Sequence, residues 1–436
     1  MNNKRTTNYI KNFTIKKALK LSMLSLLLFV NGKILGQDST EIVVPDGTEG
    51  QTMVVSKVDS VLEAPDWNDF DGKYSTLRIG AGLLYDYVTF SDDDAAKEQV
   101  RLVPEIKLRD FRFVMSGKFK TKRFFTWKLG IMYDANETSW LVRETGLMVG
   151  VPELAGYIFV GRTKEGFSLN KVMNGYAGWT WERQMALDMI PILNDGIKWM
   201  GWLPEQRIFW NIGAFADWIS QKQSYATYNF AFVTRAGWLP FYQPKKNRLL
   251  HLGLNYRYGE PKDGKIQLRS KPEVNPFPYF ISTGTFAANH SNIYGWEAYF
   301  QWGSLMLGTE GYFNQFSSPD KGNPLFKGGE AEINYILTGE ARPYSTVSGI
   351  YGFVPVKKSV FDGGWGAWEV LVRVSSMDLN GGTIEGGKFW RITPMVNWFL
   401  SKDIRMEFGY GYGVLDRYDL QGHFQFFQSR IQLAFL

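Results

Sequence analysis

The chain has 436 residues, with 45 glycines, no cysteine and an aromatic content of 16%. A chain without cysteine can form no disulfide bond and cannot carry the lipid-modified cysteine of a lipoprotein. The formal net charge of +6 comes from the first 36 residues, which hold seven basic and no acidic side chains. Charge therefore gives no argument for nucleic-acid binding by the rest of the chain.

Residues 1–36 have the pattern of a secretory signal peptide. A basic stretch is followed by an apolar run at 21–30 and then by a small residue, Gly36. An apolar run of this length is too short to span a bilayer, and a small residue suits cleavage by a signal peptidase. We predict that residues 1–36 are removed; the alternative is that they form an amphipathic membrane anchor.

Residues 37–73 are acidic and polar and have no periodic pattern. We predict a flexible lead-in here, which would act as a plug or as an arm that binds a partner. A single folded domain is predicted for residues 74–436.

From residue 74 onward, apolar and polar residues alternate. Leu77, Ile79 and Ala81, for example, alternate with Arg78 and Gly80. Successive side chains of a β-strand point to opposite faces, so this pattern predicts strands with one apolar and one polar face. The clearest segments are 74–90, 124–136, 208–218, 228–238, 249–258, 294–302, 404–412 and 429–435, and weaker ones are 100–116, 155–162, 264–271, 327–338, 365–374 and 389–400.

A β-sandwich, which is the alternative fold, produces the same alternation. A barrel in lipid is favoured because the segments are long, because their apolar faces are rich in Trp, Tyr and Phe, and because their other faces carry charged residues. Only a closed barrel satisfies every backbone polar group in hydrocarbon. We therefore predict an all-β fold, a transmembrane antiparallel β-barrel of about 16 strands. Short connections such as 120–123 are predicted to be periplasmic turns, and longer ones such as 270–292 to face outward.

Residues 163–196 interrupt the succession of predicted strands and short turns. The segment is too long for a turn and, with Phe167, Trp179 and Trp181, too aromatic for a disordered loop. We predict that it folds into the barrel as a constriction loop and brings Lys164, Lys171 and Arg183 to the narrowest point. The alternative is an ordinary surface loop.

Short motifs in this segment and in the last third of the chain resemble those of a known family. Residues 161–169 (GRTKEGFSL), followed by Glu182 and Arg183, resemble the entry to the constriction loop of the phosphate-selective porin O/P family. The stretches 337–340 (LTGE), 366–369 (GAWE) and 397–400 (NWFL) agree with it. The resemblance implies a trimeric porin of sixteen strands, whose inward loop and luminal basic side chains pass phosphate or similar anions.

Anion selectivity needs cations in a narrow, partly dehydrated passage. Together with Lys164, Arg183 and Lys171, the candidates for the constriction include Arg162. By alternation, the other inward basic residues are Arg78, Lys107, Lys128, Arg235, Arg257, Arg269, Arg373, Arg391, Arg405 and Arg430. Inward acids are also plentiful: Asp86, Glu105, Asp134, Glu297, Glu310, Glu332, Glu369 and Glu407. The alternative role for most of these charges is to pair across neighbouring strands and solvate the wall.

These patterns predict a porin in the outer membrane of a Gram-negative bacterium, through which small solutes, and anions such as phosphate in particular, diffuse passively. The expected partners are outer-membrane lipid, small anions and two further copies of the chain in a homotrimer, but no nucleic acid. Three scattered histidines, His251, His290 and His423, form no metal cluster, and no nucleophile–base pair is brought together, so neither an enzyme nor a cofactor is expected. The alternative function is that of a structural or accessory subunit of a larger outer-membrane complex, with its pore blocked.

Overall fold

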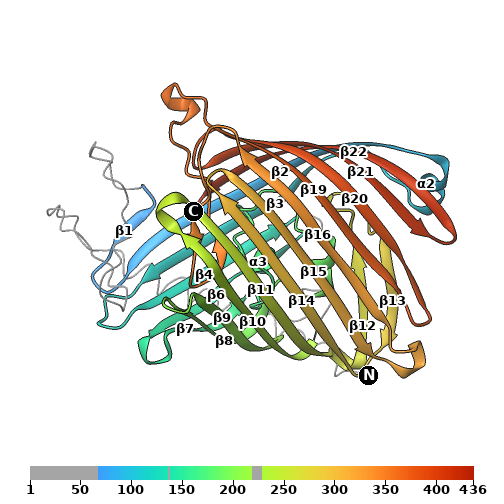
Figure 1. Ribbon diagram of the computed structural model, residues 1–436, viewed down its shortest axis with the longest axis horizontal. Coiled ribbons are helices and arrows are strands. Elements are labelled where there is room, and N and C mark those ends of the chain that lie inside the picture. Colours follow the sequence, from blue (N-terminus) through green and yellow to red (C-terminus); the bar gives the residue numbers. More distant parts are fainter. Residues whose placement is uncertain (1–66, 136–137, 219–227) are drawn as a thin grey trace, which may run out of the picture. The chain divides into compact units, whose positions relative to one another are not determined.

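Sixteen long antiparallel strands form a closed barrel, because the last strand, β22, pairs with the first long strand, β2. A computed structural model describes residues 67–135, 138–218 and 228–436 (Figure 1). The prediction of an all-β transmembrane barrel is confirmed. The barrel strands are β2 (Thr76–Asp92), β3 (Glu105–Lys118), β4 (Phe125–Asp134), β6 (Thr145–Val151), β7 (Gly156–Thr163), β8 (Asn194–Leu203), β9 (Ile208–Ala216), β10 (Tyr228–Gln243), β11 (Arg248–Pro261), β14 (His290–Trp302), β15 (Leu305–Ser317), β16 (Leu325–Ile336), β19 (Ala367–Gly381), β20 (Ile384–Phe399), β21 (Ile404–Arg417) and β22 (Leu420–Phe435).

Two short strands extend this wall. β1 (Asp69–Asp71) pairs with the start of β2, and β5 (Ser139–Val142) pairs with the end of β4, beyond the residues that pair with β6. β1 lies at the end of the predicted lead-in. The predicted signal peptide at 1–36 and the lead-in up to residue 66 lie outside the described residues.

The two faces of the strands differ as the alternation predicts. On β11, Leu254 is 70% exposed on the outer face, whereas the neighbouring Asn255 is buried on the inner face. Outward Trp, Phe, Leu and Ile side chains recur on most of the other strands. The inner faces carry the charged residues, so the register that alternation assigns is correct for β10, β11, β14, β16 and β19 to β22.

The two ends of the barrel differ in the length of their connections. The end where β2 starts and β22 stops has short turns at 119–124, 152–155, 204–207, 244–247, 303–304 and 400–403. Short turns are periplasmic in barrels of this kind, so this end, at the left in Figure 1, is the periplasmic one. The opposite end carries long connections at 93–104, 164–193 and 262–289 together with tight turns at 382–383 and 418–419, and one connection at the periplasmic end, 337–366, is also long.

Three long connections contact inward-facing side chains of the wall, and we name them inserts. Insert 1 (164–193) contains α3 (Leu169–Val172) and η2 (Met185–Met189), and insert 2 (262–289) contains the hairpin of β12 (Lys265–Ser270) and β13 (Ile281–Ala287). Insert 3 (337–366) contains β17 (Tyr344–Ser345), β18 (Ile350–Tyr351) and η6 (Val360–Asp362), and it starts at the periplasmic end.

Insert 2 corrects two predictions. Residues 264–271 are not a barrel strand, because β12 pairs with β13 in a separate two-stranded sheet. Residues 270–292 do not simply face outward either, since Glu273, Val274, Phe277 and Phe280 are buried. One face of the β12 hairpin packs on apolar side chains, which produces the same alternation as a strand in lipid.

The remaining helical elements are short. α2 (Asp94–Gln99) follows β2, with Asp93 accepting a hydrogen bond from the Ala96 amide at 2.8 Å as its N-cap. Single turns are η1 (Pro152–Leu154), η3 (Pro244–Lys246), η4 (Lys262–Gly264) and η5 (Pro319–Lys321). No helix within the described ranges is both long and apolar enough to cross a membrane.

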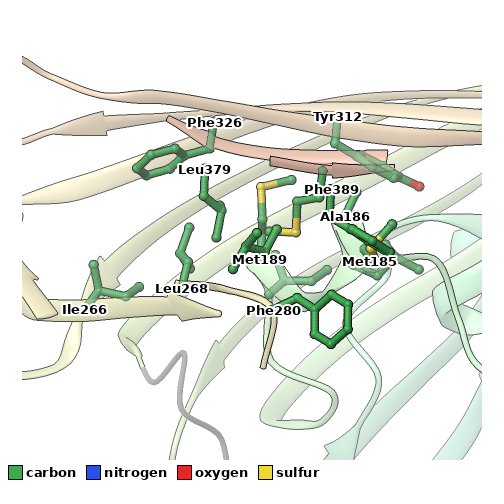
Figure 2. Packing of buried hydrophobic residues seen from close by; sticks show 14 of the residues in the cluster. Met185, Ala186, Met189, Ile266, Leu268, Phe280, Tyr312, Phe326, Leu379 and Phe389 are labelled. Carbon is green, nitrogen blue, oxygen red and sulfur yellow. The ribbon is translucent and has the colours of Figure 1, made fainter. Parts of the chain in front are cut away.

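An apolar core lies inside the barrel, on one side of it. Met185, Ala186 and Met189 of insert 1 pack with Ile266, Leu268 and Phe280 of insert 2 (Figure 2). The same cluster includes wall residues such as Tyr312, Phe326, Leu379 and Phe389, from β15, β16, β19 and β20. The inner face of these strands is therefore covered by protein.

Candidate functional site

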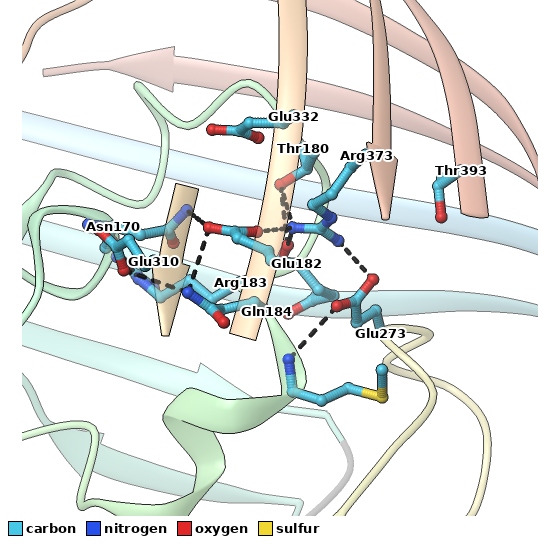
Figure 3. Close-up of polar contacts among 12 residues, drawn as sticks. Asn170, Thr180, Glu182, Arg183, Gln184, Glu273, Glu310, Glu332, Arg373 and Thr393 are labelled. Carbon is cyan, nitrogen blue, oxygen red and sulfur yellow. Dashed lines mark hydrogen bonds and ion pairs between the residues drawn. The ribbon is translucent and has the colours of Figure 1, made fainter. Parts of the chain in front are cut away.

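Insert 1 is attached to the wall through carboxylates of β14, β15 and β16. The amide of Leu169 donates to Glu297 Oε2 at 2.5 Å, and that of Asn170 donates to Glu310 Oε1 at 3.0 Å. Asn170 Nδ2 also donates to Glu330 Oε1 at 3.1 Å. The first amides of a helix have no partner within the helix, so these carboxylates satisfy donors that would otherwise be buried unpaired. Figure 3 shows Asn170 and Gln184 of insert 1 directed toward Glu310.

Two of the predicted constriction residues meet at one carbonyl group. Lys164 Nζ donates to the carbonyl oxygen of Met173 at 2.6 Å, and Arg183 Nη2 donates to the same oxygen at 2.8 Å. Arg183 Nε also donates to the carbonyl oxygen of Asn170 at 2.9 Å. The nearest carboxylate to Lys164 is that of Glu144, with 3.6 Å between Nζ and Oε1. Main-chain carbonyls position these two cations without cancelling their charge.

Burial weakens the proton affinity of these cations. It holds the pKa of the Lys164 ammonium well below its usual range, against the attraction of Glu144. Burial, with repulsion from Arg112 next, lowers the pKa of Arg183 to about 10. An anion beside the two side chains would oppose both shifts, because a negative charge favours their protonated forms.

The other two predicted constriction residues lie elsewhere. Lys171 Nζ donates to the carbonyl oxygens of Ile190 and Pro191 within insert 1, and burial lowers its pKa to about 7. Arg162 lies in the wall, where its Nη1 contacts Asp195 Oδ1 of β8 at 2.9 Å. The structure therefore brings together Lys164 and Arg183 and leaves Lys171 and Arg162 in separate environments.

Alternation did not identify the basic residues that face this pair. Arg112 of β3 stacks on the ring of Tyr176, with 4.7 Å from its guanidinium carbon to the ring centroid. A β-carbon at Gly175 would lie 3.5 Å from Arg112 Nη1 and 3.7 Å from Arg183 Nη2, so these two guanidinium groups flank the same glycine. Arg143, between β5 and β6, lies close enough to Arg112 and Arg183 for their like charges to oppose its own.

A β-bulge explains why Arg112 was missed. The pairing of β2 with β3 shifts by one residue between Leu84 and Tyr85, which leaves Arg109 unpaired in the ladder. Lys107 lies inward on one side of the bulge and Asp110 and Arg112 lie inward on the other. The sequence does indicate the bulge, because in a regular strand the charged residues 105, 107 and 109 would lie on one face and the charged residues 110 and 112 on the other.

Together these residues form what we call the basic cluster. It comprises Arg109, Arg112, Lys128, Arg143, Lys164 and Arg183, which outnumber the acids among them, Asp110, Glu144 and Glu182. The side chains of Arg112, Arg109 and Lys128 are 15%, 19% and 39% exposed. Solvent therefore reaches the lumen along β3 and β4, on the side that the apolar core does not cover.

The other predicted luminal cations each contact an acidic or polar partner. Several of these partners belong to inserts and not to a neighbouring strand, which refines the expectation of cross-strand pairs. The pairs are Arg78–Asp69 (2.7 Å), Lys107–Glu105 (3.6 Å), Arg235–Glu297 (2.6 Å), Arg257–Glu165 (2.7 Å), Arg373–Glu273 (2.5 Å), Arg405–Glu407 (2.5 Å) and Arg430–Asp86 (2.5 Å), and Arg391 donates to Thr393 at 2.8 Å. Arg269 was expected on the barrel wall and lies on β12 instead, with its guanidinium 4.1 Å from the centroid of the Tyr279 ring.

The profile of the phosphate-selective porin O and P family matches residues 77–435. The chain belongs to this family. The porin is 31% identical over 175 residues to an uncharacterized protein of Caulobacter vibrioides, and that match covers 39% of the porin and 35% of its relative. Family and fold place the porin in the outer membrane of a Gram-negative bacterium and indicate a channel and not an enzyme.

Solved structures share the fold of the porin at low sequence identity. The trimer form of OmpT, an outer membrane protein of Vibrio cholerae, has a TM-score of 0.52 at 10% identity, over 83% of the porin and 99% of that chain. The outer membrane channel DcaP of Acinetobacter baumannii has a TM-score of 0.52 at 8% identity, over 84% and 99%. OmpF of Salmonella typhi, solved with daunomycin, has a TM-score of 0.51 at 8% identity, over 83% and 99%.

Proposed function

We propose that this porin passes small anions of the phosphate class and that the basic cluster selects them. The observation that carries the proposal is the convergence of Lys164 and Arg183 on one carbonyl group opposite Arg112, on the solvent-reached side of the lumen. Most of the cations elsewhere on the wall contact carboxylates, as Arg235, Arg257 and Arg373 do. An anion would therefore meet an excess of positive charge beside insert 1, which we propose as the constriction.

The physical basis is replacement of water. A small anion that enters a narrow passage loses part of its hydration shell, and fixed N–H donors must take the place of those waters. Guanidinium groups present paired donors that match the oxygens of a phosphate, and an ammonium adds a point charge. The lower dielectric constant of a narrow passage through protein strengthens each interaction relative to bulk water.

The test is a planar-bilayer measurement in a salt gradient. Replacing Lys164 and Arg183 together with glutamine should move the reversal potential toward cation preference and weaken the block of chloride current by phosphate. Lys97→Gln is the control, since this exposed lysine pairs with Asp94 on α2 and not with a residue of the basic cluster. An unchanged reversal potential in the double variant would show that insert 1 does not set the selectivity.

A second function remains as a proposal because the lumen is largely filled on one side. The buried core of inserts 1 and 2 would equally suit a structural subunit of a larger outer-membrane complex. The absence of conductance in the purified parent protein would favour that function. We also propose that the chain forms a homotrimer and catalyses no reaction.

A further inference from the structure

Insert 3 reaches insert 1 from the opposite end of the barrel. The other turns at the periplasmic end are short, but residues 337–366 reach Arg235, near the middle of β10. Arg342 Nη1 of insert 3 donates to the carbonyl oxygen of Ala177 in insert 1 at 2.8 Å. The rings of Tyr351 and Trp179 are in edge contact, with centroids 6.1 Å apart. The two inserts therefore form one packed unit.

A first wall carboxylate, Glu297 of β14, is bonded directly to insert 1 and, through Arg235 of β10, to insert 3. Its Oε2 accepts from the Leu169 amide of insert 1 at 2.5 Å, and its Oε1 accepts from Arg235 Nε at 2.6 Å. Arg235 in turn donates to the carbonyl oxygens of Ser348 and Gly349 in insert 3, at 2.8 and 2.7 Å. The Glu297 carboxylate thus orients the first turn of α3 in insert 1 and the Arg235 guanidinium, which is hydrogen-bonded to insert 3.

A second wall carboxylate, Glu369 of β19, makes the same kind of connection. Its Oε2 accepts from Arg342 Nη2 of insert 3 at 2.9 Å and from Asn397 Nδ2 at 2.8 Å. Asn397 Nδ2 also donates to the carbonyl oxygen of Trp179 in insert 1 at 2.7 Å. Two carboxylates on different strands therefore each join both inserts to the wall.

The residues that make these connections are buried. Glu297 and Glu369 are 2% and 0% exposed, and Arg235 and Arg342 are also buried. Removing one partner of a buried ion pair leaves the other partner charged and unpaired, which strongly destabilises the segment that the ion pair holds in place. The barrel ladder itself does not depend on these side chains, since β14 pairs with β11 and β15 along its length through backbone bonds. Loss of the carboxylates should therefore release the inserts before it opens the barrel.

We propose that Glu297 and Glu369 are positioning residues that hold inserts 1 and 3 together in the lumen and thereby set the size limit of the porin. With both carboxylates ionised and bonded, insert 3 closes the half of the lumen that borders β10 to β19, and solutes pass along β3 and β4. When the carboxylates are replaced by neutral side chains, insert 3 can leave and a wider passage opens. This inference does not rest on the proposed anion selectivity, because size exclusion applies equally to neutral solutes.

The experiment uses neutral sugars and vesicle swelling. The double variant Glu297→Gln and Glu369→Gln should conduct more in a single-channel recording and should admit a larger sugar, for example a disaccharide where the parent admits a monosaccharide. Asp195→Asn is the matched control, because Asp195 is an equally buried inward carboxylate whose partner, Arg162, lies on the neighbouring strand of the wall. The reversal potential, measured in parallel, reports the anion preference separately.

A second measurement follows insert 3 directly. Because the chain has no cysteine, Ala177→Cys introduces a single thiol at a position that is 2% exposed beneath Arg342. Maleimide should label this thiol slowly in the parent and faster when the two carboxylates are replaced. Arg342→Gln removes one connection without altering a barrel strand and keeps the test available if the double variant does not fold. Folded variants that show neither a larger size limit nor faster labelling would overturn the proposal.

Discussion

A charge placed on the outer face of β11 should destabilise the barrel according to its depth. Leu254 lies near the middle of this strand of 14 residues and is 70% exposed, so its side chain meets lipid near the centre of the bilayer. We predict that Leu254→Arg lowers the free energy of unfolding by about 2–4 kcal/mol. At about 1.4 kcal/mol per tenfold change, this corresponds to a loss of roughly 30-fold to 700-fold in the folding equilibrium constant.

The comparison that makes this prediction specific is a charge at the end of a strand. Leu325 is 44% exposed and is the first residue of β16, close to the extracellular interface. Leu325→Arg should cost only about 0–1 kcal/mol, because the new guanidinium can reach the headgroups. Denaturant unfolding in lipid vesicles, followed by the heat-dependent gel shift of the folded barrel, measures both values. Equal costs at the two positions would refute the assignment of Leu254 to mid-membrane.

Three further predictions concern the lumen and the amino terminus. Phe280→Ala should lower stability by about 3–5 kcal/mol in the same unfolding assay, because this fully buried ring of insert 2 packs against the wall inside the barrel. Burial alone would raise the pKa of Glu182, but the guanidinium groups of Arg109 and Arg430 outweigh it and lower this pKa to about 2 from an ordinary 4.5. A carboxylate whose pKa is lowered in the folded state stabilises the fold at pH values above its ordinary pKa, and this stabilisation is lost as the pH falls toward 2. The free energy of unfolding, measured from pH 5 to pH 2, should therefore decline, and Glu182→Gln should remove this part of the decline. N-terminal sequencing of the membrane-extracted protein should find Gln37 as the first residue, and a retained Met1 would contradict the predicted signal peptide.

The alternation of apolar and polar residues identified the strands that have lipid on one face and a polar lumen on the other. β11 is such a case, with Leu252 and Leu254 in lipid and His251 and Asn255 inside. β15 was not recognised, because its inward Met306 and Phe316 pack on protein and are as apolar as its outer face. The pattern of a strand reports what surrounds it, and an insert inside the barrel removes the contrast.

The candidate site was predictable in part for a similar reason. Insert 1 has an unusual length and many aromatic residues, so its own cations, Lys164 and Arg183, could be identified without any strand register. Arg112 depends on the bulge in β3, and the partners Glu165 and Glu273 belong to inserts whose folded course no local pattern reveals. Pairing across large sequence separations is set by tertiary packing.

The apolar core gives the two sides of the barrel different freedom to change over evolutionary time. On β10 to β22, almost every inward-facing charged side chain contacts a buried partner, so a substitution there affects folding before it affects transport. The side chains along β3 and β4 meet water and tolerate replacement more easily. A lineage could therefore acquire a new solute preference by exchanging a few residues on the wet side, while the dry side is inherited unchanged as a scaffold.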